Sequence, residues 1–228
     1  MGNWVKLKAA DGVEIDAWRA EPKGRPRGGL VVCQEIFGVN AHIRGVAEGY
    51  AAQGYLAIAP ALFDRAQRGI ELGYDSAGFA RGRELLGAIP REKTLLDLEA
   101  AVALAAEAGK VGVVGYCWGG TLSWVASAQS SGVAAAVGYY GSGILGLKDL
   151  SPKAPTMLHF GEKDPSSPMS GIEELGKAHP EVALFTYPAG HAFNRAGNEA
   201  WHEASAALAL TRTLAFFGAH LGASGAQS

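Results

Sequence analysis

A cysteine lies between two glycines in the segment Gly-Tyr-Cys-Trp-Gly at positions 115–119, which follows an apolar run over 111–114. A Gly-x-nucleophile-x-Gly turn between a strand and a helix strains the backbone of its middle residue and lifts that side chain from the sheet edge toward the positive end of the helix. The motif usually carries serine, whereas a cysteine thiolate needs less help from a base to attack a carbonyl. The segment therefore predicts that Cys117 is a nucleophile.

Asp164 and His191 supply a carboxylate and an imidazole in the order nucleophile, acid, histidine that α/β-hydrolases use. Asp164 follows the apolar run 156–160, and His191 follows the apolar run 183–187. Both residues therefore lie just past the carboxyl ends of predicted strands, at the edge to which the Cys117 turn points. A nucleophile needs a base in reach and a carboxylate that holds the base in the right tautomer. We expect the three side chains to meet there.

Each of these residues also has a plainer interpretation. Cys117 can be a packing cysteine, His191 a loop histidine bonded to backbone, and Asp164 a cap for the segment that follows it. Glu162 is the nearest rival for the role of the acid. His159 lies inside a strand pattern and is interpreted as a core residue whose ring nitrogens are satisfied.

The apolar pattern predicts the scaffold that positions these residues. An Asp-Gly turn at 11–12 between alternating segments predicts an antiparallel hairpin. Further strands are predicted at 30–33, 56–59, 111–114, 134–137, 156–160 and 183–187, and helices at 43–52, 92–107, 120–129, 171–177 and 201–217. Strands without alternation, mostly followed by helices, indicate a mostly parallel sheet covered on both faces. A hairpin that feeds such a sheet favours the α/β-hydrolase fold.

The 228 residues suit a single α/β domain over 1–228. The segment 61–89 is too long for an ordinary connection, and we expect a partly helical excursion over the active-site edge. Residues 222–228 are a Gly/Ser-rich stretch for which we expect a flexible tail.

Composition and charge exclude several functions. With 20 basic and 22 acidic residues, a net charge of −2 and no basic stripe, a nucleic-acid partner is not expected. No run approaches the roughly 18 apolar residues of a membrane span, and residues 1–6 lack the apolar core of a signal peptide. A cytoplasmic location is therefore expected, with Cys33 as a buried packing residue not bridged to Cys117. The histidines form no metal-ligand cluster and no dinucleotide fingerprint follows an early strand, so we expect neither a metal nor a cofactor.

Four segments together resemble the dienelactone hydrolase family, the carboxymethylenebutenolidases, which are cysteine hydrolases of the α/β-hydrolase fold. They are Cys-Gln-Glu-Ile-Phe-Gly-Val-Asn at 33–40, Val-Gly-Tyr-Cys-Trp-Gly-Gly at 114–120, Val-Gly-Tyr-Tyr-Gly at 137–141 and Ala-Gly-His-Ala-Phe at 189–193. The similarity spans nearly the whole chain. It implies Cys117 as nucleophile, His191 as base and Asp164 as the residue that orients the base.

The resemblance also implies roles for residues near the first strand of the parallel sheet. Glu35 is expected to hold the resting thiol and to take part in its activation when substrate enters, because a thiol ionised only on demand is protected from oxidation. A solvated loop carboxylate is the alternative for Glu35. The backbone N–H groups of Ile36 and Trp118 resemble the oxyanion hole of the family, which stabilises the charge that builds on the carbonyl oxygen.

Substrate-binding residues are implied by the same resemblance. Arg195 matches the family arginine that pairs with a substrate carboxylate, and a bidentate guanidinium suits that planar anion. The family brings a second arginine and a tyrosine from the excursion, and the resemblance assigns these roles to Arg81 and Tyr74. Phe37 is expected to line an apolar pocket.

The predicted function is hydrolysis of small lactones or esters, carboxylated or neutral, through a thioester acyl-enzyme, by a monomer or small homo-oligomer. Two other enzymatic interpretations stay open: a broad-specificity carboxylesterase, and a relative of serine-type esterases or peptidases that tolerates cysteine. A third interpretation is a non-catalytic, redox-responsive thiol protein on the same fold.

Overall fold

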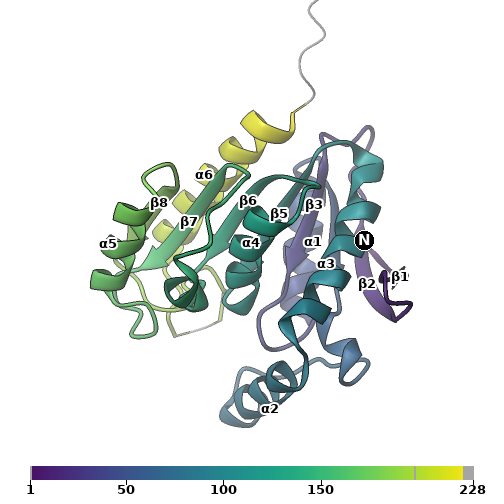
Figure 1. The fold of residues 1–228 in the computed structure, drawn as a ribbon, viewed down its shortest axis with the longest axis horizontal. Helices are drawn as coiled ribbons and strands as arrows, with labels where there is room; N and C mark the ends of the chain where they lie inside the picture. The colour runs from purple at the N-terminus through teal and green to yellow at the C-terminus, as the bar shows by residue number, and fades with distance from the viewer. Residues whose placement is uncertain (1, 198, 223–228) are drawn as a thin grey trace, which may run out of the picture.

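An eight-stranded sheet forms the centre of the computed structural model, which describes residues 2–197 and 199–222 (Figure 1). The strand order is β1-β2-β4-β3-β5-β6-β7-β8, in which β2 is antiparallel to both of its neighbours, β1 and β4, and the remaining pairs are parallel. The strands are β1 (Asn3–Lys8), β2 (Glu14–Ala20), β3 (Gly29–Cys33), β4 (Leu56–Pro60), β5 (Val111–Tyr116), β6 (Val133–Tyr139), β7 (Thr156–Gly161) and β8 (Ala183–Tyr187). The predicted hairpin and mostly parallel sheet are confirmed.

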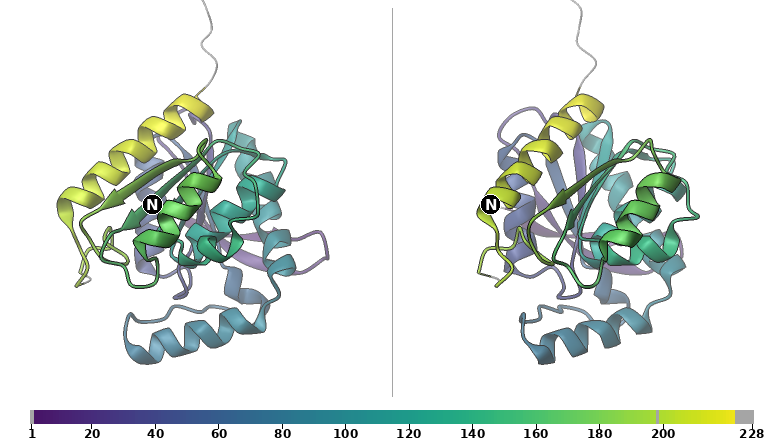
Figure 2. Two further views of the ribbon diagram at one scale, coloured as in Figure 1. Left: turned by 60° about the vertical axis from the view of Figure 1, so that its left-hand side comes forward. Right: turned by 90° about the vertical axis from the view of Figure 1, so that its left-hand side faces the viewer.

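Helices cover both faces of the sheet. They are α1 (Ala41–Ala52), α2 (Ser76–Ala88), α3 (Arg91–Ala105), α4 (Trp118–Gln129), α5 (Met169–Ala178) and α6 (Glu203–Leu221), with short 3₁₀ turns η1 (Leu62–Arg65), η2 (Ala106–Ala108) and η3 (Ser142–Leu147). Side views place α6 on one face and α4 and α5 on the other (Figure 2). Consecutive residues of β3 enter different cores: Leu30 packs into the cluster that contains α1 and α6 residues, and Val31 into the one that contains α3 and α4 residues. Burial on both faces explains why these strands read as continuous apolar runs.

The segment 61–89 contains η1 and α2, and α2 crosses the end of the sheet where the parallel strands terminate (Figure 2). The helix packs closely on the loop after β3, since a side chain added at Gly82 would lie 2.0 Å from the Ile36 carbonyl oxygen. An isolated antiparallel bridge between Gly38 and Glu71 fastens the same loop to the segment before α2. A partly helical excursion is therefore present; its action as a lid stays a prediction.

A partly buried ion-pair cluster joins this segment to the hairpin and to α3. Arg65 donates to both oxygens of Asp97, at 2.7 and 2.9 Å, and to Asp11 at 3.0 and 3.1 Å. The Asp97 side chain is completely buried, so the Arg65 guanidinium is what compensates its charge. The cluster anchors the start of the excursion.

Within residues 2–197 and 199–222, no helix has the length and apolar character needed to cross a membrane. The cytoplasmic location and the single domain over 1–228 stay predictions. Of the predicted tail at 222–228, only Gly222 is among the described residues.

Candidate active site

The turn after β5 holds Cys117 at the N-cap of α4 with φ 54° and ψ −115°, a backbone conformation that residues other than glycine rarely adopt. The flanking glycines make this turn possible: a side-chain carbon at Gly115 would lie 1.9 Å from the Gly119 carbonyl oxygen, and one at Gly119 would lie 2.3 Å from the Cys33 carbonyl oxygen. The Cys117 N–H donates to the Tyr139 carbonyl at 3.0 Å, which ties the turn to β6. The geometry is the strained strand-to-helix turn that the sequence predicted.

His191 and Asp164 meet at the same edge, in the loops after β8 and β7. The His191 Nδ1 atom lies 2.6 Å from Asp164 Oδ2, a short distance typical of a charge-assisted hydrogen bond. Asp164 is 2% exposed, while the His191 side chain is about one-third exposed. Ala192, with φ 59°, marks the sharp turn that presents the histidine. The structure thus brings together the predicted acid and base.

Asp164 and His191 each stabilise the charged form of the other. Burial opposes ionisation of Asp164, but hydrogen bonds from His191 and Ser166 outweigh burial and lower the pKa of the Asp164 carboxyl. Burial also disfavours a charged His191, yet the hydrogen bonds with Asp164 and Cys117 and the charges of both raise the pKa of His191 to about 10. The raised pKa of His191 thus reflects an interaction with Cys117 as well as with Asp164. An imidazolium held between a carboxylate and a sulfur is suited to proton transfer at that sulfur.

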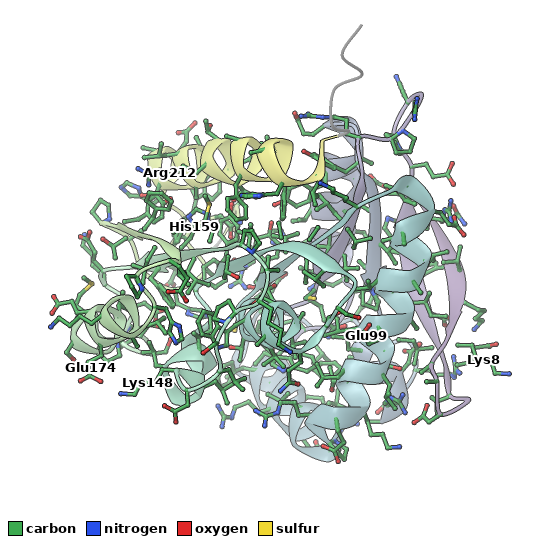
Figure 3. All side chains as sticks on the ribbon, turned by 45° about the horizontal axis from the view of Figure 1, so that its top comes forward. Lys8, Glu99, Lys148, His159, Glu174 and Arg212 are labelled. Carbon is green, nitrogen blue, oxygen red and sulfur yellow. The ribbon has the colours of Figure 1, made fainter. Side chains whose placement is uncertain are left out.

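The rival residues occupy other environments. Glu162 is exposed and accepts a hydrogen bond from Thr186 at 3.0 Å. His159 is fully buried, and its Nδ1 and Nε2 atoms bond the hydroxyls of Tyr187 (2.9 Å) and Thr213 (3.1 Å). Burial, helped by the charge of Arg212, lowers the pKa of His159 to about 3. Both residues are labelled in Figure 3. The interpretation of His159 as a satisfied core residue is confirmed.

Glu35 is 1% exposed, so the alternative of a solvated loop carboxylate is wrong. Its two oxygens each accept a hydrogen bond from Arg195 Nη1 at 3.1 Å. The structure therefore shows the carboxylate paired with a guanidinium. Arg195 in turn lies over the Tyr74 ring at 3.8 Å and near the Phe37 ring at 5.7 Å. Arg195, the arginine expected to bind substrate, thus forms one cluster with its expected aromatic neighbours and with Glu35.

Arg81, on α2, lies outside that cluster. It pairs with Glu84 at 2.5 Å, one helical turn along, and donates to Gln67. Tyr74 is the residue of the excursion that the structure brings to Arg195, with its hydroxyl 3.0 Å from the Asn40 amide nitrogen. A role for Arg81 in substrate binding stays a prediction.

The two backbone amides expected to form an oxyanion hole flank the turn. Trp118 is the first residue of α4, and the first N–H groups of a helix have no partner within the helix. Ile36 follows β3, which is paired with β5 in parallel register up to Cys33 and Gly115. Both residues therefore adjoin the end of the strand pair that carries the nucleophile.

Sequence reasoning missed two residues that contact the His191 environment. Tyr140, with φ 39°, places its ring centroid 4.9 Å from that of His191, and its hydroxyl donates to Asn194 Oδ1. Ser166 bonds Asp164 through both its N–H and its hydroxyl. The Asp-Pro-Ser order at 164–166 is a signal for such a side-chain-capped turn, since Asx turns bond the backbone two residues on.

Both cysteines are free, as expected. Cys33 is buried, and burial raises the pKa of its thiol. Within the part of the chain that the structure describes, no group of three or more His, Cys, Asp or Glu residues is placed to hold a metal ion. The expectation of no metal and no cofactor stays a prediction.

The fold and the turn before α4 are those of an α/β-hydrolase. Residues 15–221 match the model of the dienelactone hydrolase family, and the chain belongs to that family. A carboxymethylenebutenolidase of Pseudomonas putida is 35% identical, over 93% of this chain and 94% of its own length. A putative carboxymethylenebutenolidase of Escherichia coli K12 is 33% identical, over 91% and 83%.

Solved structures agree with this placement. A putative dienelactone hydrolase of Klebsiella pneumoniae superimposes with a TM-score of 0.84 at 31% identity, covering 96% of this chain and 98% of its own. A dienelactone hydrolase-like promiscuous phosphotriesterase from metagenomic libraries has a TM-score of 0.74 at 19% identity, over 96% and 98%, and shows the fold alone. The chain is a dienelactone-hydrolase-like enzyme that hydrolyses ester bonds.

Proposed function

We propose that the chain hydrolyses small lactones and esters through a thioester acyl-enzyme, with Cys117 as nucleophile, His191 as base and Asp164 as the residue that orients the base. The observation that carries the proposal is the 2.6 Å bond between His191 and a buried Asp164. The interaction of His191 with Cys117, which also raises the pKa of the imidazole, supports it. Nucleophile, base and orienting acid in contact are the functional unit of acyl transfer.

In the first half-reaction the Cys117 sulfur attacks the carbonyl carbon, and the N–H groups of Ile36 and Trp118 hydrogen-bond the oxygen as it becomes negative. The carbon–oxygen bond of the ester breaks, and the leaving oxygen takes the proton held on His191. In a lactone this step opens the ring and leaves the alcohol on the acyl group. In the second half-reaction His191 takes a proton from water, the hydroxide displaces sulfur, and the acid leaves.

Arg195 and Glu35 support a preference for carboxylated substrates. The Arg195 guanidinium lies on Tyr74 and pairs with Glu35, so an incoming carboxylate of the substrate competes with Glu35 for the same donors. A released Glu35 carboxylate is then free to take part in activating the thiol. This exchange agrees with the on-demand activation expected for Glu35.

A broad-specificity carboxylesterase is the second proposal. It is favoured by the same ion pair, because Arg195 already has a partner and a neutral ester needs no exchange. A panel of dienelactones, saturated lactones and aryl esters on purified protein separates the two. We expect turnover of the lactones, fastest for carboxylated ones, and its loss in Cys117→Ala. An active Cys117→Ala variant would refute the proposed chemistry, and equal rates across the panel would favour the broad esterase.

A further inference from the structure

Ser166 contacts both members of the acid–base pair. Its backbone N–H donates to Asp164 Oδ1 at 2.9 Å, and its hydroxyl donates to the same oxygen at 2.6 Å. The hydroxyl oxygen also lies 3.4 Å from His191 Nδ1. The exposed Ser166 therefore bonds Asp164 Oδ1, whereas His191 bonds Asp164 Oδ2. The Ser166 hydroxyl oxygen also approaches His191 Nδ1.

The protons of this group can be placed by counting donors. The single hydroxyl proton of Ser166 is used on Asp164 Oδ1, so the hydroxyl oxygen can only accept from His191. His191 Nδ1 then faces two acceptors, Asp164 Oδ2 and Ser166 Oγ, and must carry a proton. The arrangement leaves the Nε2 side of the ring for exchange with sulfur.

We propose that Ser166 is a positioning residue for ester hydrolysis, whose hydroxyl keeps Asp164 ionised and fixes the proton of His191 on Nδ1. The inference rests on the proposed function of Cys117, Asp164 and His191. The carboxylate receives three hydrogen bonds, two of which come from Ser166, and each donor to an ionised carboxylate disfavours its protonation.

The neighbouring serine provides a matched control. Ser167 is 1% exposed, and its hydroxyl has no hydrogen-bond partner among the described residues. Ser167→Ala removes the same atom one position further along the loop without touching Asp164. Ser166→Ala removes the hydroxyl but keeps the backbone N–H bond, and Ser166→Thr keeps a hydroxyl at this exposed position.

The test is the pH profile of kcat/KM for a neutral aryl ester, measured on the wild type and these three variants. Without the Ser166 hydroxyl the protonated form of Asp164 persists to higher pH, so the acid limb moves upward. For Ser166→Ala we expect that shift together with a loss of about 10-fold in kcat and little change in KM, equal to about 1.4 kcal/mol of barrier. Ser166→Thr should recover most of the activity, and Ser167→Ala should match the wild type.

A second readout does not depend on turnover. In proton NMR spectra, the chemical shift of the downfield His191 Nδ1–H signal should change in Ser166→Ala and stay unchanged in Ser167→Ala. An unshifted acid limb in a folded Ser166→Ala variant, with solvent replacing the hydroxyl, would overturn the inference. If Cys117→Ala is inactive while Ser166→Ala and Ser167→Ala have the same pH profile, the Ser166 inference fails and the proposed function stands. If Cys117→Ala is active, the proposed function itself fails.

Discussion

Arg195 Nη1 lies 3.1 Å from each carboxylate oxygen of Glu35, although the two residues are 160 positions apart in the chain. The pair joins the loop after β3 to the loop after β8, and it is almost fully buried. Because Arg195 also stacks on Tyr74, the guanidinium is held in one orientation in a partly apolar site. An arginine fixed in this way can recognise a planar anion.

Arg195→Ala should raise KM for carboxylated esters far more than KM for neutral esters, because only the former use the guanidinium in the bound state. A buried charge pair with an anionic ligand is worth about 2–5 kcal/mol, so the selectivity should fall by at least about 30-fold. The measurement is KM for two aryl esters that differ by one carboxylate. Equal increases for both esters would remove the proposed role of Arg195.

The stability of the fold should depend on the same pair. Removing the guanidinium in Arg195→Ala leaves the Glu35 carboxylate buried without compensation, which typically costs about 3–5 kcal/mol. Glu35→Gln in the Arg195→Ala background should recover part of that loss, because the uncompensated charge is gone. Urea unfolding of the four proteins of this cycle measures the coupling. Additive losses would show that the two side chains do not act as a pair.

The pH dependence of stability follows from His191 and Asp164. The pKa of His191 is raised from 6.5 to about 10, so its contribution is fully present below about pH 6.5 and is lost as pH rises toward 10. The pKa of Asp164 is lowered from 3.8, so its contribution is present above that value and is lost as pH falls through the lower, folded-state pKa. The difference in unfolding free energy between wild type and His191→Gln should therefore shrink from pH 6.5 to 10. A difference that does not vary over this range would contradict the raised pKa.

Arg65→Leu should destabilise the protein by about 3–5 kcal/mol, because it leaves Asp97 buried and unpaired. The matched control is Lys148→Ala, which breaks an exposed 2.8 Å pair with Glu174 at the surface (Figure 3) and should cost at most about 1 kcal/mol. Chemical unfolding measures both. Similar losses for the two variants would mean that burial does not decide the value of these pairs.

The sequence predicted most of the fold, because β3, β4, β5 and β7 are buried along their whole length and form short, largely apolar runs. It also predicted the turn at Cys117 and the adjacency of Asp164 and His191, since both follow strands that end at one edge. These predictions rest on the apolar periodicity, which is local, and on the rule that parallel strands end at one edge of a sheet.

The remaining contacts are between distant segments and have no local pattern. The pairing of Glu35 with Arg195 depends on how the loops after β3 and β8 meet, and the orientation of Arg81 toward Gln67 and Glu84 depends on the rotation of α2 about its axis. Ser166 was missed for a different reason. The Asp-Pro-Ser turn signal is visible in the sequence, but it does not reveal that Asp164 also bonds His191 and so brings Ser166 close to the imidazole. Distant pairings of this kind require coordinates.

The most direct test of the proposed chemistry is the intact mass of the protein after rapid mixing with p-nitrophenyl acetate, followed by peptide mapping. The wild type should gain one acyl group on Cys117, at a rate that matches the release of the first equivalent of p-nitrophenol, and Cys117→Ala should gain none. An acyl group on another residue, or full turnover by Cys117→Ala, would contradict the assignment of the nucleophile.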